Sequence, residues 1–258
     1  MSIDLHTDAH GIAVITINRP ETRNAMDAEH YALLSDTWQR VRDDAAIRVA
    51  IITGAGDLAF SAGADLKSYI GKPAGLDALW LTQQGQLLNR GLEIWKPVIA
   101  AVNGYCVGGG MTLMLATDIR IAATHASFGL SEVKRGVIAG NGGTQRAIAQ
   151  LPYPIAMEML LTGDRIDAAT AERWGLVNKV VPQAQLMDEA MAYAARIAAN
   201  APLAVQAAKE LAVRAPELGL TNGLRMEQFV NRVLSASEDV REGTAAFAEK
   251  RPPTFHGR

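Results

Sequence analysis

KPVIAAVNGYCVGGG, at residues 96–110, contains the most informative local pattern in the chain. Residues 98–102 (VIAAV) form a short apolar run rich in β-branched side chains, which predicts a buried strand. The glycine-rich stretch 104–110 predicts a turn, and residues 111–118 (MTLMLATD) predict a helix. Residues 119–123 (IRIAA) then predict a further strand. A strand, a turn, a helix and a second strand in this order are typical of an α/β core.

The same alternation extends in both directions from this stretch. Strands are predicted at 12–18, 49–53 and 177–181. Helices are predicted at about 28–42 with Asp27 as the cap, at 78 to about 95, and between Asp167 and Gly175. In the first of these helices Tyr31, Leu34, Trp38 and Val41 share one face, which predicts a stripe that packs on the core.

The pattern becomes purely helical after about residue 185. A strong apolar stripe is formed there by Met226, Phe229, Val230, Val233 and Leu234. We therefore predict an α/β core at 1–197 and a helical C-terminal region at 198–258. The helical region would pack on its own core or on a partner subunit.

The bulk composition indicates a globular protein and excludes several classes. The 258 residues suit one large domain with a small appendage, and a net charge of −2 does not suit a nucleic-acid-binding protein. The single cysteine, Cys106, allows no intramolecular disulfide. Neither a secretory signal nor an apolar run long enough for a membrane span is evident. We expect a cytoplasmic protein without membrane or nucleic-acid partners.

Several common site signatures are missing. GYCVGGG does not match the dinucleotide-binding pattern, and the sequence has no P-loop, no G-x-S-x-G and no H-E-x-x-H motif. The five histidines are scattered, without metal-ligand spacing. A hydrolase triad and a metal site are therefore not predicted.

Three segments could together carry chemistry beside a carbonyl group. Gly108-Gly109-Gly110 and the small residues of 61–67 can present backbone N–H groups, and Glu132 lies before a second glycine-rich turn. Each segment alone has a plain structural explanation, as a tight turn, a loop or a solvated charge. In combination, backbone donors and a carboxylate suit a reaction in which charge builds up on a carbonyl oxygen as an enolate.

At these segments the sequence resembles the crotonase (enoyl-CoA hydratase/isomerase) superfamily. The matching stretches are FSAGADLK (60–67), KPVIAAVNGYCVGGG (96–110), FGLSEVKRGVIAGNGGTQR (128–146), MLLTGDRIDAATAERWGLVNKVV (159–181) and AFAEKR (246–251). The resemblance covers nearly the whole chain and is closest to the enoyl-CoA hydratase and carnitinyl-CoA dehydratase branches. It implies a spiral of ββα units with a C-terminal helical trimerisation region, and a trimer or a dimer of trimers.

The resemblance also implies a site for an acyl-CoA thioester. The thioester carbonyl would lie in an oxyanion hole formed by the N–H groups of Ala64 and Gly109, and Gly140 would lie near the catalytic water. Coenzyme A would be contacted by Arg23, Ala62, Asp65, Leu66, Lys67, Phe247 and Lys250, the last two from the same or a neighbouring subunit. Coenzyme A is part of the substrate, so neither a metal nor a separate cofactor is implied. The acyl group would lie against 68–88, where Tyr69, Trp80, Leu81, Leu87 and Leu88 could wall a pocket or simply pack.

One departure from the family pattern concerns the acid/base groups. The family's hydratases use two glutamates, and Glu132 matches the second, whereas Thr112 occupies the position of the first. A threonine hydroxyl can orient water but cannot act as a carboxylic acid/base at neutral pH. We therefore predict Glu132 as the principal catalytic group and Thr112 as a group that orients water or substrate.

The departure leaves four interpretations open. The first is a hydratase with one glutamate, and the second is a Δ3-Δ2 enoyl-CoA isomerase, which needs one carboxylate. The third is an enzyme similar to the hydroxycinnamoyl-CoA hydratase-lyases, which carry a hydroxyl residue at the Thr112 position. The fourth is a non-catalytic acyl-CoA-binding homologue. The preferred interpretation is a lyase that adds or removes water at the α,β double bond of a CoA thioester.

Overall fold

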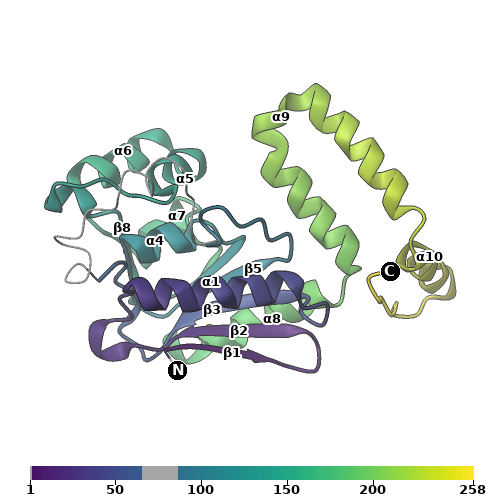
Figure 1. Ribbon diagram of the computed structural model, residues 1–258, viewed down its shortest axis with the longest axis horizontal. Coiled ribbons are helices and arrows are strands. Elements are labelled where there is room, and N and C mark those ends of the chain that lie inside the picture. The colour runs from purple at the N-terminus through teal and green to yellow at the C-terminus, as the bar shows by residue number, and fades with distance from the viewer. Residues whose placement is uncertain (1, 66–86) are drawn as a thin grey trace.

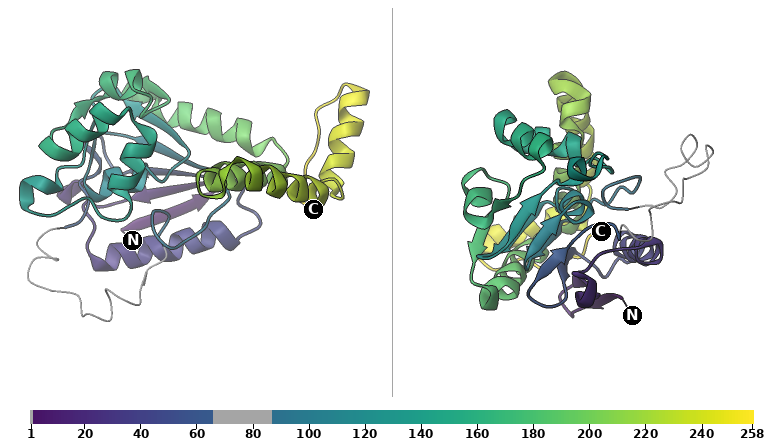
Figure 2. Two further views of the ribbon diagram at one scale, coloured as in Figure 1. Left: turned by 90° about the horizontal axis from the view of Figure 1, so that it is seen from above. Right: turned by 90° about the vertical axis from the view of Figure 1, so that its left-hand side faces the viewer.

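The chain forms an α/β body from which a pair of long helical segments projects (Figure 1). The structure, a computed structural model, describes residues 2–65 and 87–258. The body contains two sheets and most of the helices, and α9 and α10 lie to one side of it in Figure 1 and in the left view of Figure 2.

A six-stranded sheet forms the centre of the body, in the order β1-β2-β3-β5-β7-β10. Its strands are β1 (Ile3–Thr7), β2 (Ile12–Ile17), β3 (Val49–Gly54), β5 (Val98–Val102), β7 (Ile119–Ala123) and β10 (Lys179–Val181). β1 and β2 form an antiparallel hairpin, and all the other neighbours are parallel. Every residue of β3 and β5 is buried, as their continuous apolar runs predict.

A smaller sheet, β4-β6-β8-β9, lies beside the first. Its strands are β4 (Ala59–Ser61), β6 (Tyr105–Val107), β8 (Ser127–Gly129) and β9 (Ile166–Asp167). The chain passes from the large sheet to the small one three times, from β3 to β4, from β5 to β6 and from β7 to β8. This repeated passage confirms the predicted spiral of ββα units.

Helices cover both faces of the large sheet. On one face, α1 (Ala28–Asp43) buries Leu34, Trp38 and Val41 in the main core, as its apolar stripe predicts. The Asp27 side chain accepts a hydrogen bond from the His30 amide at 3.1 Å, which confirms the predicted cap. On the other face, α8 (Leu186–Ala198) packs small residues against β2, β3, β5 and β7.

Shorter helices connect the strands and the longer helices. They are η1 (Pro20–Thr22), α4 (Gly109–Met114), η2 (Glu132–Arg135), α5 (Gly143–Gln150), α6 (Tyr153–Thr162), α7 (Ala168–Arg173) and η3 (Gln183–Gln185). The predicted helix from 78 to about 95 is wrong in its C-terminal half. Residues 87–95 form turns, with isolated bridges from Leu87 to Arg90 and Gly91, and its N-terminal half is outside the described residues. The apolar side chains within 87–95 pack as loop residues. A periodic pattern in the sequence cannot distinguish such a buried loop from a helix.

The C-terminal region consists of α9 (Pro202–Leu234) and α10 (Glu238–Glu249). Within the described chain, none of the 33 residues of α9 is buried, and Gly219 at φ 66° produces a kink. No helix in the described ranges is both long enough and apolar enough to cross a membrane. The first residue of α9 follows the last of α8 by four positions, close to the predicted boundary at 197/198.

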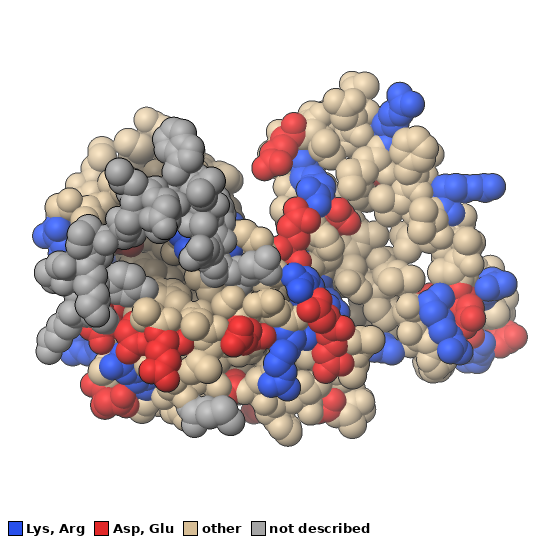
Figure 3. All heavy atoms as spheres, in the orientation of Figure 1, with Lys and Arg blue, Asp and Glu red and all other residues tan. Residues whose placement is uncertain are grey.

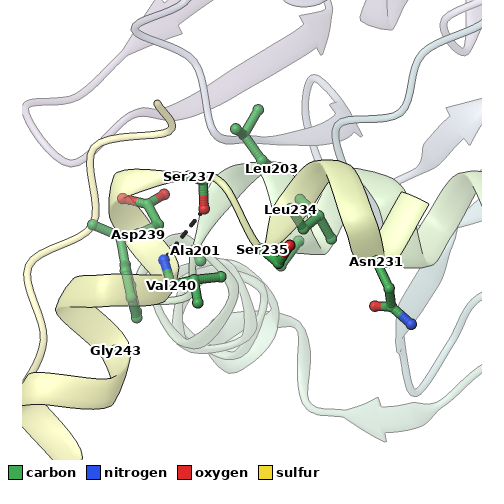
Figure 4. Close-up of a pocket in the computed structure, with 11 residues that line it drawn as sticks. Ala201, Leu203, Asn231, Leu234, Ser235, Ser237, Asp239, Val240 and Gly243 are labelled. Atoms are coloured by element: carbon green, nitrogen blue, oxygen red, sulfur yellow. Dashed lines mark hydrogen bonds between the residues drawn. The ribbon is translucent and has the colours of Figure 1, made fainter. Parts of the chain in front are cut away.

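The C-terminal tail returns to the beginning of α9 and is attached there. In Figure 4, Ser237, Asp239 and Val240 of α10 lie beside Ala201 and Leu203, and the Ser237 hydroxyl accepts a 3.2 Å hydrogen bond from the Val240 amide. The Asp239 carboxylate accepts hydrogen bonds from the amides of His256 and Gly257 at 2.7 and 2.9 Å. These hydrogen bonds attach the tail to α10, and a β-carbon on Gly257 would lie 3.4 Å from Pro202 Cγ at the beginning of α9.

Candidate active site

The glycine turn between β6 and α4 is pressed against the segment 61–64. Gly108, at φ 55° and ψ −126°, joins the strand to the helix, and its amide donates to the Gly129 carbonyl of β8 at 3.0 Å. A β-carbon on Gly110 would lie 2.3 Å from the Ser61 carbonyl oxygen, so no side chain fits there. The close approach of two backbones explains why the turn consists of glycines.

The amides of Ala64 and Gly109 lie next to each other as a result. A β-carbon on Gly109 would lie 3.3 Å from the Ala64 nitrogen, and one on Gly63 would lie 2.5 Å from the Gly109 nitrogen. Among the described residues, neither amide has a hydrogen-bond acceptor. Two adjacent unused N–H groups can stabilise a developing oxyanion. The fold thus brings the two predicted donors together across 45 positions of sequence.

Glu132 begins η2 and approaches the same turn from β8. Its Oε1 atom would lie 3.6 Å from a β-carbon on Gly108. Its Oε2 atom is buried and has no hydrogen-bond partner among the described residues. Burial raises the pKa of the Glu132 carboxyl above its ordinary value, although its backbone hydrogen bond and Arg135 oppose the shift. A carboxyl group in these surroundings can both accept and return a proton.

Thr112 occupies a buried position one helical turn beyond the glycines. Its side chain donates to the Gly108 carbonyl at 3.0 Å, and the residue is 1% exposed. A β-carbon on Gly143 would lie 3.2 Å from the Thr112 Oγ1 atom and 3.0 Å from the Ala139 side chain. The hydroxyl proton is therefore used within α4, and only the lone pairs of the oxygen are left for a water or a substrate. Its predicted role stays a prediction.

Two of the residues predicted to contact coenzyme A lie side by side. The Ala62 amide donates to the Arg23 carbonyl at 3.0 Å. The Arg23 guanidinium lies over the Tyr105 ring, 5.5 Å from its centroid, and Arg165 lies over the same ring at 4.9 Å. These contacts place positive charge near the turn, as a phosphate-bearing ligand would require.

The remaining predicted contacts differ in their surroundings. Asp65 pairs with Arg19 at 3.2 Å, so its carboxylate is already partly neutralised. Leu66 and Lys67 lie outside the described residues, as do Tyr69, Trp80 and Leu81 of the predicted acyl wall, whereas Leu87 and Leu88 are described and buried.

Gly140 and the C-terminal candidates lie in different parts of the fold. Gly140 is exposed, and its carbonyl accepts a 3.0 Å hydrogen bond from Gly143 at the beginning of α5. Phe247, 88% exposed, lies in α10 and Lys250 caps its C-terminus, and α10 lies at the opposite end of the molecule from α5 and α6 in Figure 1 and in the left view of Figure 2. One chain therefore does not bring Phe247 and Lys250 to the glycine turn.

Sequence reasoning assigned Tyr31 only to the core stripe and missed its hydroxyl. The Tyr31 ring packs on the core, but a β-carbon on Gly109 would lie 2.8 Å from its Oη atom. A partly buried phenol needs a polar neighbour, and this requirement is the only signal in the sequence that points to the position.

Other chemistries find little support in the described residues. Among residues 2–65 and 87–258, no group of three or more His, Cys, Asp or Glu side chains is arranged to hold a metal ion. Cys106 is fully buried, and burial raises the pKa of its thiol, which disfavours the nucleophilic thiolate. On the face shown in Figure 3, acidic and basic side chains are interspersed, so that face carries no single-sign field for a polyanion.

Comparison with known proteins agrees with this geometry. A family model described as enoyl-CoA hydratase/isomerase matches residues 7–258. The chain is 45% identical over 257 residues to an (E)-benzylidenesuccinyl-CoA hydratase from Thauera aromatica, and 43% identical over 264 residues to a carnitinyl-CoA dehydratase from Proteus mirabilis. Both alignments cover 100% of each chain.

Solved structures show the same likeness. A crystal structure of an enoyl-CoA hydratase from Bacillus anthracis superimposes with a TM-score of 0.93 at 36% identity, covering 100% of both chains. An enoyl-CoA hydratase from Mycobacterium tuberculosis superimposes with a TM-score of 0.89 at 37% identity, covering 100% of this chain and 99% of the other. The whole fold, including the C-terminal helices, is shared with these structures.

Proposed function

The chain belongs to the enoyl-CoA hydratase/isomerase family, and we propose that it adds or removes water at the α,β double bond of an acyl-CoA thioester through Glu132. The arrangement of groups at the glycine turn is the observation that supports this function. Two adjacent amides without acceptors among the described residues lie beside a half-buried carboxyl group. This arrangement suits a thioester whose carbonyl oxygen gains negative charge while a proton moves nearby.

Hydration would proceed through an enolate. The Glu132 carboxylate takes a proton from water while the water oxygen forms a bond to C3, and the electrons of the double bond move onto the thioester oxygen. The amides of Ala64 and Gly109 stabilise that oxygen, and one such donor contributes about 2.7–4 kcal/mol to lowering the barrier. The protonated Glu132 then delivers its proton to C2, so the carboxylate is regenerated. Dehydration is the same sequence reversed.

The surroundings of Glu132 support its use for both proton transfers. Because burial raises the carboxyl pKa, the protonated form after the first step is less acidic than an ordinary glutamic acid. The pKa therefore lies closer to working pH, where a group that must accept and donate in turn is most effective. Thr112 would accept a hydrogen bond from the attacking water, and Gly140 would lie near the same water.

An isomerase is the second candidate, and the residue at position 112 is the observation that favours it. A shift of the double bond moves one proton between two carbons and needs only one carboxylate, which Glu132 supplies. Thr112 adds no second acid/base group. A hydroxycinnamoyl-CoA hydratase-lyase and a non-catalytic binding protein are the further outcomes that the assay distinguishes.

The assay follows the absorbance of the 2-enoyl thioester with purified protein. We expect the absorbance to fall with crotonyl-CoA or benzylidenesuccinyl-CoA, or to rise as carnitinyl-CoA is dehydrated, with at least one of these substrates consumed. Glu132→Gln keeps the shape of the side chain but removes the acid/base group, and should lower kcat by about 10²–10⁴-fold while CoA-ester binding persists. Glu158→Gln on α6 is the matched control and should leave kcat unchanged.

Other outcomes identify the competing functions. Gain of absorbance with a 3-enoyl-CoA alone would make the protein an isomerase, and an aldehyde released from a hydroxycinnamoyl-CoA would make it a hydratase-lyase. Full activity of Glu132→Gln would overturn the mechanism. Thr112→Ala should change at least one kinetic parameter, and identical kinetics would remove its role.

The proposed substrate contacts need no resident metal or redox cofactor. Arg23, Ala62, Asp65, Leu66 and Lys67 would contact the coenzyme A portion of the substrate, with the Arg23 guanidinium near its phosphates. A chelator should therefore leave activity unchanged. A cytoplasmic location, expected from the sequence, stays a prediction.

We also infer that three copies of the chain assemble, as a trimer or a dimer of trimers, through α9 and α10. Large apolar side chains on these helices are exposed in the single chain, namely Leu220, Leu224, Phe229, Val233, Val240 and Phe247. Apolar side chains at this density mark a surface that another protein covers. Assembly would also allow Phe247 and Lys250 to reach coenzyme A bound to a neighbouring copy. Light scattering on the purified protein measures the number of copies.

A further inference from the structure

The glycine turn has a different polar side chain beside each of two successive glycines. Glu132 Oε1 lies 3.6 Å from the β-carbon position of Gly108, and Tyr31 Oη lies 2.8 Å from that of Gly109. The Ala64 nitrogen lies 3.3 Å from this second point. The phenol oxygen is therefore next to the amide pair, on the Gly109 side, whereas the carboxyl group is on the Gly108 side.

Tyr31 is held by α1, which packs on the main core. It lies in the first turns of α1, where its amide donates to the Asp27 carbonyl at 3.0 Å. Its ring packs on the main core, and Leu34 and Trp38 on the same helix are at most 1% exposed. A side chain supported in this way keeps one position, which a hydrogen bond to a reacting atom requires.

The chemistry of a phenol suits the position. A tyrosine hydroxyl is protonated at neutral pH, so it can donate a hydrogen bond without taking part in proton transfer. A hydrogen bond to an oxygen that becomes negatively charged is shorter and stronger than a hydrogen bond to a neutral oxygen. The phenol would therefore stabilise an enolate more than it stabilises the bound thioester.

We propose that Tyr31 donates a third hydrogen bond to the thioester oxygen, beside the amides of Ala64 and Gly109. The inference rests on the proposed function, because it requires a thioester bound at the turn. No covalent bond to Tyr31 forms or breaks. Its proton stays on the phenol oxygen while Glu132 moves a proton from water to C2. Position 109 must then be glycine for two reasons, since a side chain would displace both the oxygen and the phenol.

Tyr31→Phe tests the proposal, because it removes one oxygen atom and keeps the ring. We expect kcat to fall about 10²-fold, as for loss of one oxyanion donor, with KM changed only a few-fold. A merely structural role would not produce this separation of kcat from KM. Tyr153→Phe is the matched control, since Tyr153 is 66% exposed on α6 and should tolerate the change.

A spectroscopic measurement distinguishes the proposal from loss of stability. A conjugated aromatic acyl-CoA, such as cinnamoyl-CoA, absorbs at longer wavelength when hydrogen bonds polarise its carbonyl group. We expect the bound-state shift to be smaller in Tyr31→Phe than in the wild type and Tyr153→Phe. Partial unfolding lowers the amplitude of the shifted band without moving its wavelength, so the wavelength of the bound chromophore distinguishes the loss of a donor from a loss of folded protein.

The outcomes separate the two proposals. If the wild type turns over and Tyr31→Phe keeps both its kcat and its spectral shift, Tyr31 is not a donor and the hydratase function stands. If the wild type neither turns over any of the substrates nor shifts the bound chromophore, the proposed function is overturned, and the role of Tyr31 with it.

Discussion

The α/β body and the C-terminal helices differ in how complete they are within one chain. The body buries whole strands, such as β3 and β5, and brings the Ala64 and Gly109 amides and Glu132 to one turn. α9 buries none of its residues in the described chain, and α10 carries the 88% exposed Phe247. The difference teaches that one chain assembles the predicted oxyanion donors and the predicted acid/base group, whereas the C-terminal helices leave large apolar side chains exposed.

Apart from the loss of the Glu132 carboxyl group, the largest effect should come from closing the glycine turn. In Gly109→Ala the new β-carbon would lie 2.8 Å from Tyr31 Oη and 3.3 Å from the Ala64 nitrogen, so both the phenol and the amide pair must shift. We expect kcat to fall about 10²–10³-fold, as when one oxyanion donor is lost. Steady-state kinetics measure the change. Gly223→Ala is the control, because a β-carbon there meets no atom within 4 Å. If Gly109→Ala and Gly223→Ala had the same kcat, the glycine turn would have no role in catalysis.

A charge on the exposed face of α9 should weaken the contact between copies while the α/β body stays folded. Phe229 is 63% exposed, and Phe229→Glu would place a carboxylate in the proposed contact between copies. We expect smaller assemblies by light scattering, because burial of an unpaired charge is strongly unfavourable. The far-ultraviolet circular dichroism should persist. Gln228→Glu adds the same charge at a neighbouring exposed position of α9 and is the control. An unchanged mass of Phe229→Glu would place the contact elsewhere.

Loss of the α1 cap should have a moderate effect on the body. Asp27→Ala removes the acceptor for the His30 amide, which typically lowers the free energy of unfolding by about 1 kcal/mol. Asp27→Asn keeps an acceptor and should recover most of the loss. Denaturant unfolding measures both variants. If Tyr31 acts as proposed, Asp27→Ala should also lower kcat, since the phenol is supported by this end of α1. An unfolding free energy of Asp27→Ala equal to that of the wild type would show that the cap contributes nothing.

The smallest effect is a pH-dependent difference in stability at Glu132. Because the folded-state pKa is raised, the folded protein retains a proton that the unfolded chain has lost. The contribution of Glu132 to stability is thus fully present below the unfolded pKa and is lost as pH rises through the folded pKa. Glu132→Gln, which cannot ionise, should gain stability relative to the wild type across that window. Thermal melts at pH 4 to 8 measure the difference, and a constant difference across this range would contradict the shift.

The elements that the sequence predicts well are those whose own residues carry a clear local pattern. Strands β3, β5 and β7 were evident as apolar runs, and α1 as a capped helix with a periodic apolar face. The helix predicted to about residue 95 failed because Leu87 and Leu88 are buried in a loop, where burial follows from tertiary contacts without helical periodicity.

The candidate site divides in the same way. Its glycine-rich segments and Glu132 were recognisable from their order and spacing, which also identify the family. Two features were not recognisable: the bond from Thr112 to the Gly108 carbonyl and the position of Tyr31 Oη. Each depends on atoms that are distant in sequence or on the direction of one side chain.

The linear sequence was thus sufficient for the α/β class, the family, and the residue types available for chemistry. Periodicity, turn glycines and motif order are local properties that survive without coordinates. Only the tertiary structure decided which groups meet. A β-carbon on Gly109 approaches the Ala64 amide and the Tyr31 phenol because two backbones and a helix converge there. Contacts of that kind arise from close packing of the whole chain, which no local pattern encodes.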